Sequence, residues 1–167
     1  MRYPWVEDMR TEWRELDRRI GVLDDEFAAL AKADEAARRL ATIPGIGVLS
    51  ATALVAAIGD GRTFARGRDP AAWLGPVPRQ AATGGKPRLL GISKRGNGYL
   101  RRLLIHGARA AMPPLSGGAT PLGAWLSGLL ARAHRNVAVV ALAARLARIV
   151  IAALRGGGTF EAKAAAA

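Results

Sequence analysis

A tight turn between two helical stretches is the first place where residue types and spacing indicate chemistry. Ile43-Pro44-Gly45-Ile46-Gly47 lies between a stretch that ends near Leu40 and one that resumes at Val48. Proline cannot continue a helix, and the two glycines give the turn freedom in φ. The second helix then begins with bare N–H groups, which form an anion site that needs no side chain. This pattern indicates a helix-hairpin-helix that holds a nucleic-acid phosphate; a plain Pro-Gly connector is the alternative.

Positive charge is the second indication. The formal net charge of the 167 residues is +12 at pH 7, and after Asp69 the next acidic residue is Glu161. Such a surplus implies a polyanionic partner, which is DNA, RNA or an acidic membrane surface. Lys94 and Arg95 precede a predicted helix, where the helix dipole disfavours cations and where an anionic ligand would suit them. The predicted nucleic-acid contacts are Gly45, Ile46, Gly47, Arg79, Gly84, Gly85, Lys86, Arg88, Lys94, Arg95, Arg101 and Arg102.

Several classes of protein are disfavoured. The chain has no cysteine, and His106 and His134 have no partner at metal-ligand spacing, so the sequence predicts neither a disulfide nor a metal site. The most apolar stretch, Val137 to Leu154, contains Arg145 and Arg148, which argue against a membrane span. No signal peptide is visible. We therefore expect a soluble cytoplasmic protein of a bacterium, without a membrane partner.

The N-terminal stretch predicts a long helix from Trp5 to about Leu40. Its apolar residues recur at heptad spacing and form a seam: Trp5, Met9, Trp13, Leu16, Ile20, Leu23, Phe27 and Leu30. Such a seam must be buried against the same chain or against a second copy. We expect a coiled-coil arm and, as a hypothesis, a homo-oligomer that forms through it.

The remainder predicts a helical body with no strand ladder. Phe64 and Trp73 are expected in its core, and residues 79–88 read as a glycine loop flanked by cations, either a plain surface loop or one that closes over a phosphate backbone. The expected helices are Leu49–Ile58, Pro70–Leu74, Tyr99–Met112, Pro121–His134 and Val137–Leu154, with Pro113-Pro114 ending the third. The predicted fold is all-α, divided into a coiled-coil arm (1–40), a helical domain with the helix-hairpin-helix (41–155) and a tail (156–167).

A succession of motifs resembles one known family. The motifs are Ile43-Pro44-Gly45-Ile46-Gly47, Trp73-Leu74-Gly75, Val77-Pro78-Arg79-Gln80, Thr83 to Gly96, Tyr99-Leu100-Arg101, Leu103 to Arg109 and Arg135 to Ala138. In this order and spacing they resemble the C-terminal Tnp domain, of the transposase family 20 type, of the bridge-RNA-guided insertion-sequence transposases. The resemblance covers about Leu40 to Leu154. It implies a recombinase subunit that acts as an oligomer on double-stranded DNA with a structured bridge RNA.

The resemblance also implies catalytic groups, from which this chain departs. In that family an N-terminal RuvC-like domain binds Mg²⁺ through four carboxylates, and we expect this chain to lack that domain and to need no cofactor of its own. A serine nucleophile is expected just before Gly84-Gly85, where the sequence reads Ala81-Ala82-Thr83. The candidate catalytic residues are therefore Thr83 and Ser93, and the alternative for Ser93 is a helix cap.

Two functions follow from these expectations. The first is the DNA-binding C-terminal part of an insertion-sequence transposase, as a truncated or split copy that is inactive alone. The alternative is a non-catalytic nucleic-acid-binding module that acts as a regulator or as a competitor of full-length copies. A membrane-surface protein is disfavoured, because an arginine-rich amphipathic helix does not need the Pro-Gly turn or the internal glycine loop.

Overall fold

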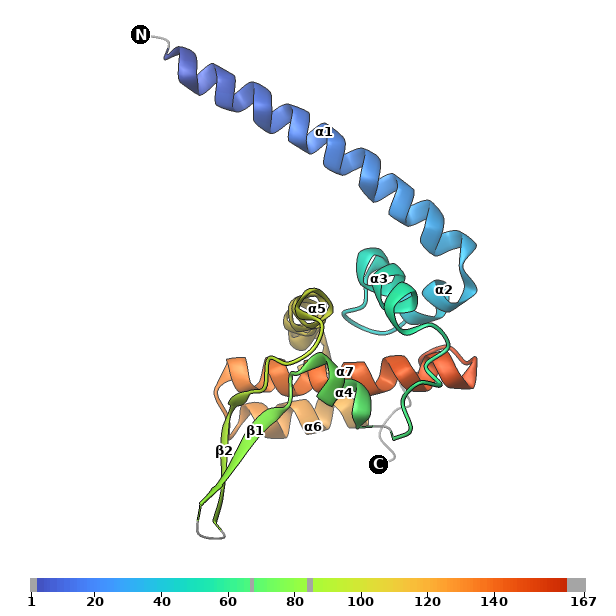
Figure 1. Cartoon of the computed structure of the whole chain (residues 1–167), viewed down its shortest axis with the longest axis vertical. Coiled ribbons are helices and arrows are strands. Elements are labelled where there is room, and N and C mark those ends of the chain that lie inside the picture. Colours follow the sequence, from blue (N-terminus) through green and yellow to red (C-terminus); the bar gives the residue numbers. More distant parts are fainter. Residues whose placement is uncertain (1–2, 67, 84–85, 162–167) are drawn as a thin grey trace.

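A long helical arm projects from a helical body in the computed structural model, which describes residues 3–66, 68–83 and 86–161 (Figure 1). The elements in chain order are α1 (Pro4–Ala33), α2 (Glu35–Ala41), α3 (Val48–Ile58), α4 (Asp69–Leu74), β1 (Pro78–Thr83), β2 (Lys86–Ile92), α5 (Gly98–Ser116), α6 (Pro121–Leu130) and α7 (Arg135–Gly156). The prediction of a helical fold with a long N-terminal helix is confirmed.

The core of the body is built around α7. Its Val139, Leu142, Leu146 and Val150 are fully buried, and α5, α4, α2 and α6 all pack against it. Within the described residues α7 is long and apolar enough to cross a membrane by length and composition, but half of its most apolar window is buried in the body. Packing in the core therefore accounts for its apolar character.

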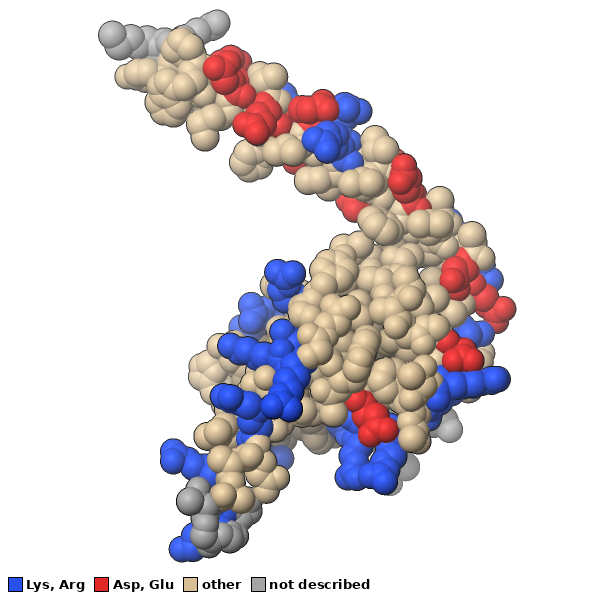
Figure 2. Space-filling model, viewed as in Figure 1, with Lys and Arg blue, Asp and Glu red and all other residues tan. Residues whose placement is uncertain are grey.

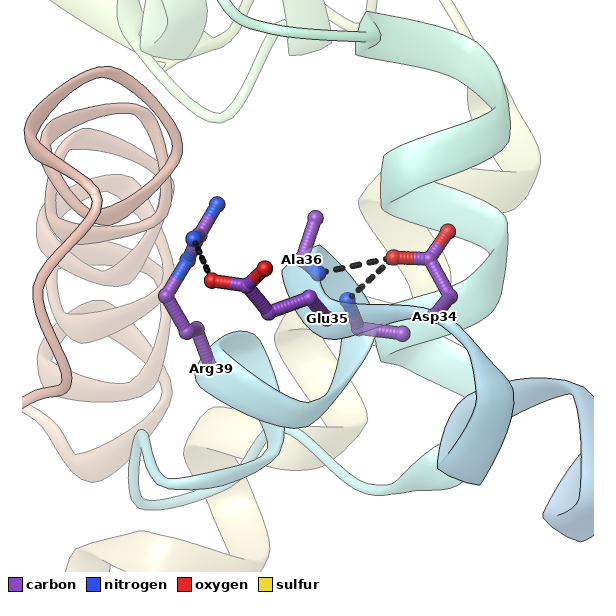
Figure 3. Close-up of polar contacts among 5 residues, drawn as sticks. Asp34, Glu35, Ala36 and Arg39 are labelled. Carbon is purple, nitrogen blue, oxygen red and sulfur yellow. Dashed lines mark hydrogen bonds and ion pairs between the residues drawn. The ribbon is translucent and has the colours of Figure 1, made fainter.

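The arm ends earlier than the sequence predicted. Asp34 has extended backbone angles, and its Oδ1 accepts hydrogen bonds from the N–H groups of Ala36 at 2.7 Å and Ala37 at 3.1 Å (Figure 3). A side-chain cap of this kind starts a new helix, which Glu35 and Arg39 then brace with an ion pair at 2.8 Å. The expected single helix to Leu40 is therefore wrong, because the Asp34 cap divides it into α1 and α2.

The expectation of no strand ladder is also wrong. β1 and β2 form an antiparallel hairpin in which Gln80 pairs with Leu89 and Thr83 pairs with Lys86, with an irregularity between Pro78 and Gln80. Gly84 and Gly85, which join the strands, lie outside the described residues. A Gly-Gly pair between two extended runs is a recognised hairpin signal. Proline in both runs and alanine in the first hide that signal, since neither residue favours strands.

Two helix ends differ from expectation. α5 continues through Pro113 and Pro114 to Ser116, although each proline there lacks the N–H group that would donate to the carbonyl four residues earlier. α6 ends at Leu130 instead of His134. His134 caps α7, and its Nδ1 accepts a hydrogen bond from Asn136 N at 3.2 Å.

The predicted core residues are mostly buried. Ile43, Ile46 and Leu54 pin α2 to α3, and Phe64 fills the core as expected. Trp73 was expected to be buried but is 39% exposed, and Leu49 is 38% exposed. Leu49 lies in the first turn of α3, which opens to the surface, and Trp73 lies edge-on against Phe64 at the side of the body.

Candidate nucleic-acid interface

The turn between α2 and α3 is packed backbone-to-backbone on α5. Gly45 has φ +85°, and a Cβ added to it would lie within 3.0 Å of the Gly107 carbonyl oxygen. A Cβ on Gly107 would likewise lie within 3.0 Å of the Gly45 oxygen. Glycine is therefore required at both positions, and this contact sets the orientation of the turn relative to α5.

The N-terminus of α3 faces outward from this turn. Gly47 is its N-cap residue with φ −85°, no side chain caps the helix, and nothing lies within 4 Å of a Cβ built on Gly47. A hollow of about 560 Å³ borders the turn and is lined on the other side by Leu103, His106 and Ala110 of α5. Two helices joined by a tight turn are therefore present, and phosphate binding by Gly45, Ile46 and Gly47 stays a prediction.

Exposed cations form a cationic edge along the hairpin and α5. Figure 2 shows Lys and Arg along this side of the body, whereas most of the visible Asp and Glu lie on the arm. The edge consists of Arg79, Lys86, Arg88, Lys94, Arg95, Arg102 and Arg109, all of them exposed. In the described part of the chain, the ion pairs involve Arg10, Arg18, Arg39 and Arg62, and none involves the cationic edge.

The loop that carries Lys94 and Arg95 is held against the end of α4. Ser93 N donates to Val77 O at 2.8 Å, and Lys94 N donates to Gly75 O at 3.1 Å. Lys94 has φ +55°, which is unusual for a residue with a side chain. Backbone hydrogen bonds to a segment distant in the sequence therefore fix this loop, and both cationic side chains are exposed to solvent.

Two glycines make this packing possible. A Cβ on Gly75 would lie within 3.0 Å of Arg95 O, and a Cβ on Gly96 would lie within 3.0 Å of Trp73 O. Arg101 of α5 closes the arrangement, because its Nη1 donates to Leu74 O at 3.0 Å and to Arg95 O at 3.3 Å. Arg101, which the sequence placed among the nucleic-acid contacts, therefore also positions the loop.

The candidate nucleophiles differ in their surroundings. The Ser93 hydroxyl is half-buried and donates to Gly75 O at 3.3 Å, which favours a structural role. It does not cap α5, because Asn97 Oδ1 accepts from Tyr99 N and Leu100 N. Thr83 ends β1, but its side chain lies outside the described part of the chain. The described residues hold no group of three His, Cys, Asp or Glu that would bind a metal.

α5 is the common support of these features. Its first turns hold the loop through Arg101, its middle receives the turn at Gly107, and Arg102, His106 and Arg109 share one face at helical spacing. From the sequence, His106 was considered only as a metal ligand, and Gly107 was given no structural role. A glycine in the middle of an amphipathic helix was the available signal, because it often marks a close approach of another backbone.

Comparison with known proteins finds similarity to transposases. Residues 37–117 match the Transposase IS116/IS110/IS902 family. The chain is 46% identical over 149 residues to a probable family 20 transposase of Pseudomonas aeruginosa, covering 89% of this chain and 44% of that protein. It is 44% identical over 151 residues to the transposase for insertion sequence element IS1111A of Coxiella burnetii, covering 90% and 42%. It is 48% identical over 128 residues to the transposase for IS1328 of Yersinia enterocolitica, covering 77% and 38%.

These matches place the chain among proteins related to insertion-sequence transposases. The match of residues 37–117 to the Transposase IS116/IS110/IS902 family, and the family 20 transposase among the relatives, agree with the family 20 resemblance. The chain spans less than half the length of these curated relatives. The matched residues include α2, α3, the hairpin and α5, which are the elements that carry the turn and the cationic edge.

Proposed function

We propose that this chain is the DNA-binding part of an insertion-sequence transposase and that it holds the phosphate backbone of double-stranded DNA along the cationic edge. The observation that carries the proposal is the exposure of seven cations from the hairpin, the loop and α5, without an acidic partner among the described ion pairs. Phosphates are the ligands that such a row of Arg and Lys favours.

The hairpin is the element best shaped to approach a groove. β1 and β2 form a two-stranded ribbon that extends from the body (Figure 1) and carries Arg79 and Arg88 on its exposed positions. A two-stranded ribbon has the width that the major groove of B-DNA admits. In this proposal the ribbon enters a groove, while Lys94, Arg95 and Arg102 contact the flanking phosphates.

The N-terminus of α3 supplies a further phosphate contact in the proposal. Gly47 has no Cβ to shield the first N–H groups, and the hollow beside it has room for a phosphate. A structured guide RNA presents the same phosphate chemistry, so it is a proposed second partner. DNA transposition itself, with Mg²⁺ held by a RuvC-like domain, is proposed only for the whole protein and not for the described residues.

One observation favours the alternative function of a non-catalytic regulator. The Ser93 hydroxyl is used in a bond to Gly75 O, and alanine occupies positions 81 and 82 at the end of β1. A chain that binds DNA without a free nucleophile would compete with active copies for the same sites. Strand-joining assays separate the two functions. If the wild-type chain joins strands and Thr83→Ala abolishes that joining, catalysis by this chain is supported. If the chain instead inhibits strand joining by an active relative, competition is supported.

A salt titration tests the proposed DNA binding. The affinity of the wild type for a duplex is expected to fall steeply with salt, and Arg88→Gln or Arg95→Gln is expected to reduce the slope of log K against log [salt] by about one. Arg18→Gln is the matched control, because Arg18 is an exposed cation on the arm that pairs with Glu15. A shallow wild-type slope, or equal effects of Arg18→Gln and Arg88→Gln, would contradict the proposal.

A further inference from the structure

The first turn of α3 borders the hollow of about 560 Å³ through Gly47 and Ser50. The N–H groups of Val48, Leu49 and Ser50 have no hydrogen-bond acceptor among the described residues, and no side chain caps the helix. Ala51 N is already used, because it donates to Gly47 O at 2.8 Å. Three unpaired N–H groups at the positive end of a helix favour an anion.

Ser50 brings a buried hydroxyl to the same hollow. The residue is 8% exposed and lines the hollow, and its hydroxyl makes no hydrogen bond within the described part of the chain. Thr52 of the same helix behaves in the usual way, since its Oγ1 donates back to Val48 O at 3.0 Å. A buried hydroxyl without a partner costs free energy, and alanine would favour the helix more. A ligand that enters the hollow would account for this serine.

The wall opposite Ser50 supplies an imidazole. His106 of α5 is exposed, lines the hollow and makes no hydrogen bond to a described residue. Thr42, also in the lining, is occupied, because its Oγ1 donates to Arg39 O at 2.7 Å and accepts from Phe160 N at 3.0 Å. The described lining contains no acidic residue. The hollow therefore offers hydroxyl, imidazole and backbone donors without negative charge, which suits a tetrahedral oxyanion.

We propose that the hollow is a phosphate site, in which the Ser50 hydroxyl, the His106 imidazole and the N-terminus of α3 bind one backbone phosphate of double-stranded DNA. The inference rests on the proposed DNA binding and assigns two residues to it. Arg102, His106 and Arg109 share one face of α5. The strand held at the phosphate site therefore runs along that face, with neighbouring phosphates beside the two arginines. A bound phosphate at a fixed place sets the position of the strand, which exposed arginines alone do not.

Inorganic phosphate tests the phosphate site without DNA. In ¹H–¹⁵N spectra of the full chain at constant pH and ionic strength, phosphate is expected to shift the amide signals of Val48, Leu49 and Ser50 and the ring signals of His106. Chloride at the same ionic strength is the reference and is expected to leave them in place. Ser50→Ala is expected to raise the dissociation constant for phosphate by roughly tenfold, because a hydrogen bond to a charged group is lost. Absence of these shifts would overturn the inference, whatever the chain does with DNA.

Binding to a duplex tests the two side chains. Ser50→Ala and His106→Gln are each expected to weaken it by about threefold to tenfold. Ser127→Ala is the matched control, because its hydroxyl donates to Ser116 O and does not line the hollow, and a change of less than about twofold is expected. Ser50→Ala is expected to keep or raise the midpoint of thermal unfolding, since the lost hydroxyl had no partner in the described chain. A fall of several degrees would identify a structural serine and contradict the assignment.

A double variant shows whether Ser50 and the helix N-terminus bind the same phosphate. Gly47→Asp places a carboxylate where the phosphate would lie, so adding Ser50→Ala in that background is expected to weaken duplex binding by less than about twofold. Additive losses would place Ser50 outside the phosphate site. Steeply salt-dependent binding that Ser50→Ala and His106→Gln leave unchanged would preserve the proposed DNA binding and overturn this inference. An effect confined to a structured RNA hairpin would likewise overturn it.

Discussion

At the scale of single residues, glycine decides how the interface is assembled. Gly45 and Gly107 let the turn and α5 meet through their backbones, and Gly75 and Gly96 do the same for α4 and the loop. None of these positions leaves room for a methyl group, and the obstructing atoms belong to backbone that cannot turn away. The interface is therefore sensitive to changes that add only one carbon atom.

Gly107→Ala is expected to reduce the free energy of unfolding by about 1–3 kcal/mol, because the added Cβ meets the Gly45 carbonyl. Gly128→Ala is the matched control on α6, where nothing lies within 4 Å of the added atom. That change is expected to stabilise the protein by about 0.5–1 kcal/mol through helix propensity. Urea unfolding of both variants measures the difference, and equal effects would mean that the Gly45–Gly107 contact does not hold the turn.

Gly47→Asp separates the stability of α3 from phosphate binding at its N-terminus. Gly47 has extended backbone angles that any residue adopts, and aspartate caps a helix at least as well as glycine, so stability is expected to change by only a few tenths of a kcal/mol. The added carboxylate is expected to weaken duplex binding by roughly tenfold if a phosphate sits there. Gly47→Ser caps without charge and is expected to bind within about twofold of wild type. Undiminished binding by the aspartate variant would exclude the turn from the interface.

At the scale of elements, the Asp34 cap separates arm from body. The carboxylate of Asp34 receives two N–H groups of α2, so α1 and α2 meet at an angle and α2 can pack against α7. Without this bend the chain would continue as one helix and Leu40 would leave the core, where it is fully buried. The Asp34 cap thus lies at the bend between the arm and the body.

Asp34→Ala is expected to lower the free energy of unfolding by about 1 kcal/mol, since it removes both cap hydrogen bonds. Asp25→Ala, an exposed change on α1, is the control and is expected to alter stability by less than about 0.5 kcal/mol. Thermal unfolding followed by circular dichroism provides the measurement. Identical midpoints for the two variants would show that the bend is held by packing and not by the cap.

At the scale of the whole molecule, the arm and the body carry net charges of opposite sign. Acidic residues outnumber basic ones on α1, whereas the body is strongly cationic (Figure 2).

The sequence by itself determined those features that depend on residues close together in the chain. The heptad seam of α1, the Pro-Gly turn before α3 and the surplus of cations after Asp69 all appear as patterns of a few residues, and the succession of motifs matched one transposase family. The sequence patterns did not predict the hairpin or the Asp34 bend. Both have local signals, but strands interrupted by proline and a single aspartate inside a helical pattern are weak ones.

Only the tertiary structure decided which residues act on a ligand and which hold the scaffold. Arg101 and Ser93 look like site residues in the sequence, but their side chains bond to backbone carbonyls of residues 74, 75 and 95. In the sequence, Gly107 is a glycine inside a helix, where glycine is unfavourable. In the structure it is the residue of α5 against which the backbone of the turn packs at Gly45. These roles depend on contacts between segments distant in the chain, and packing of the folded body is what brings those segments together.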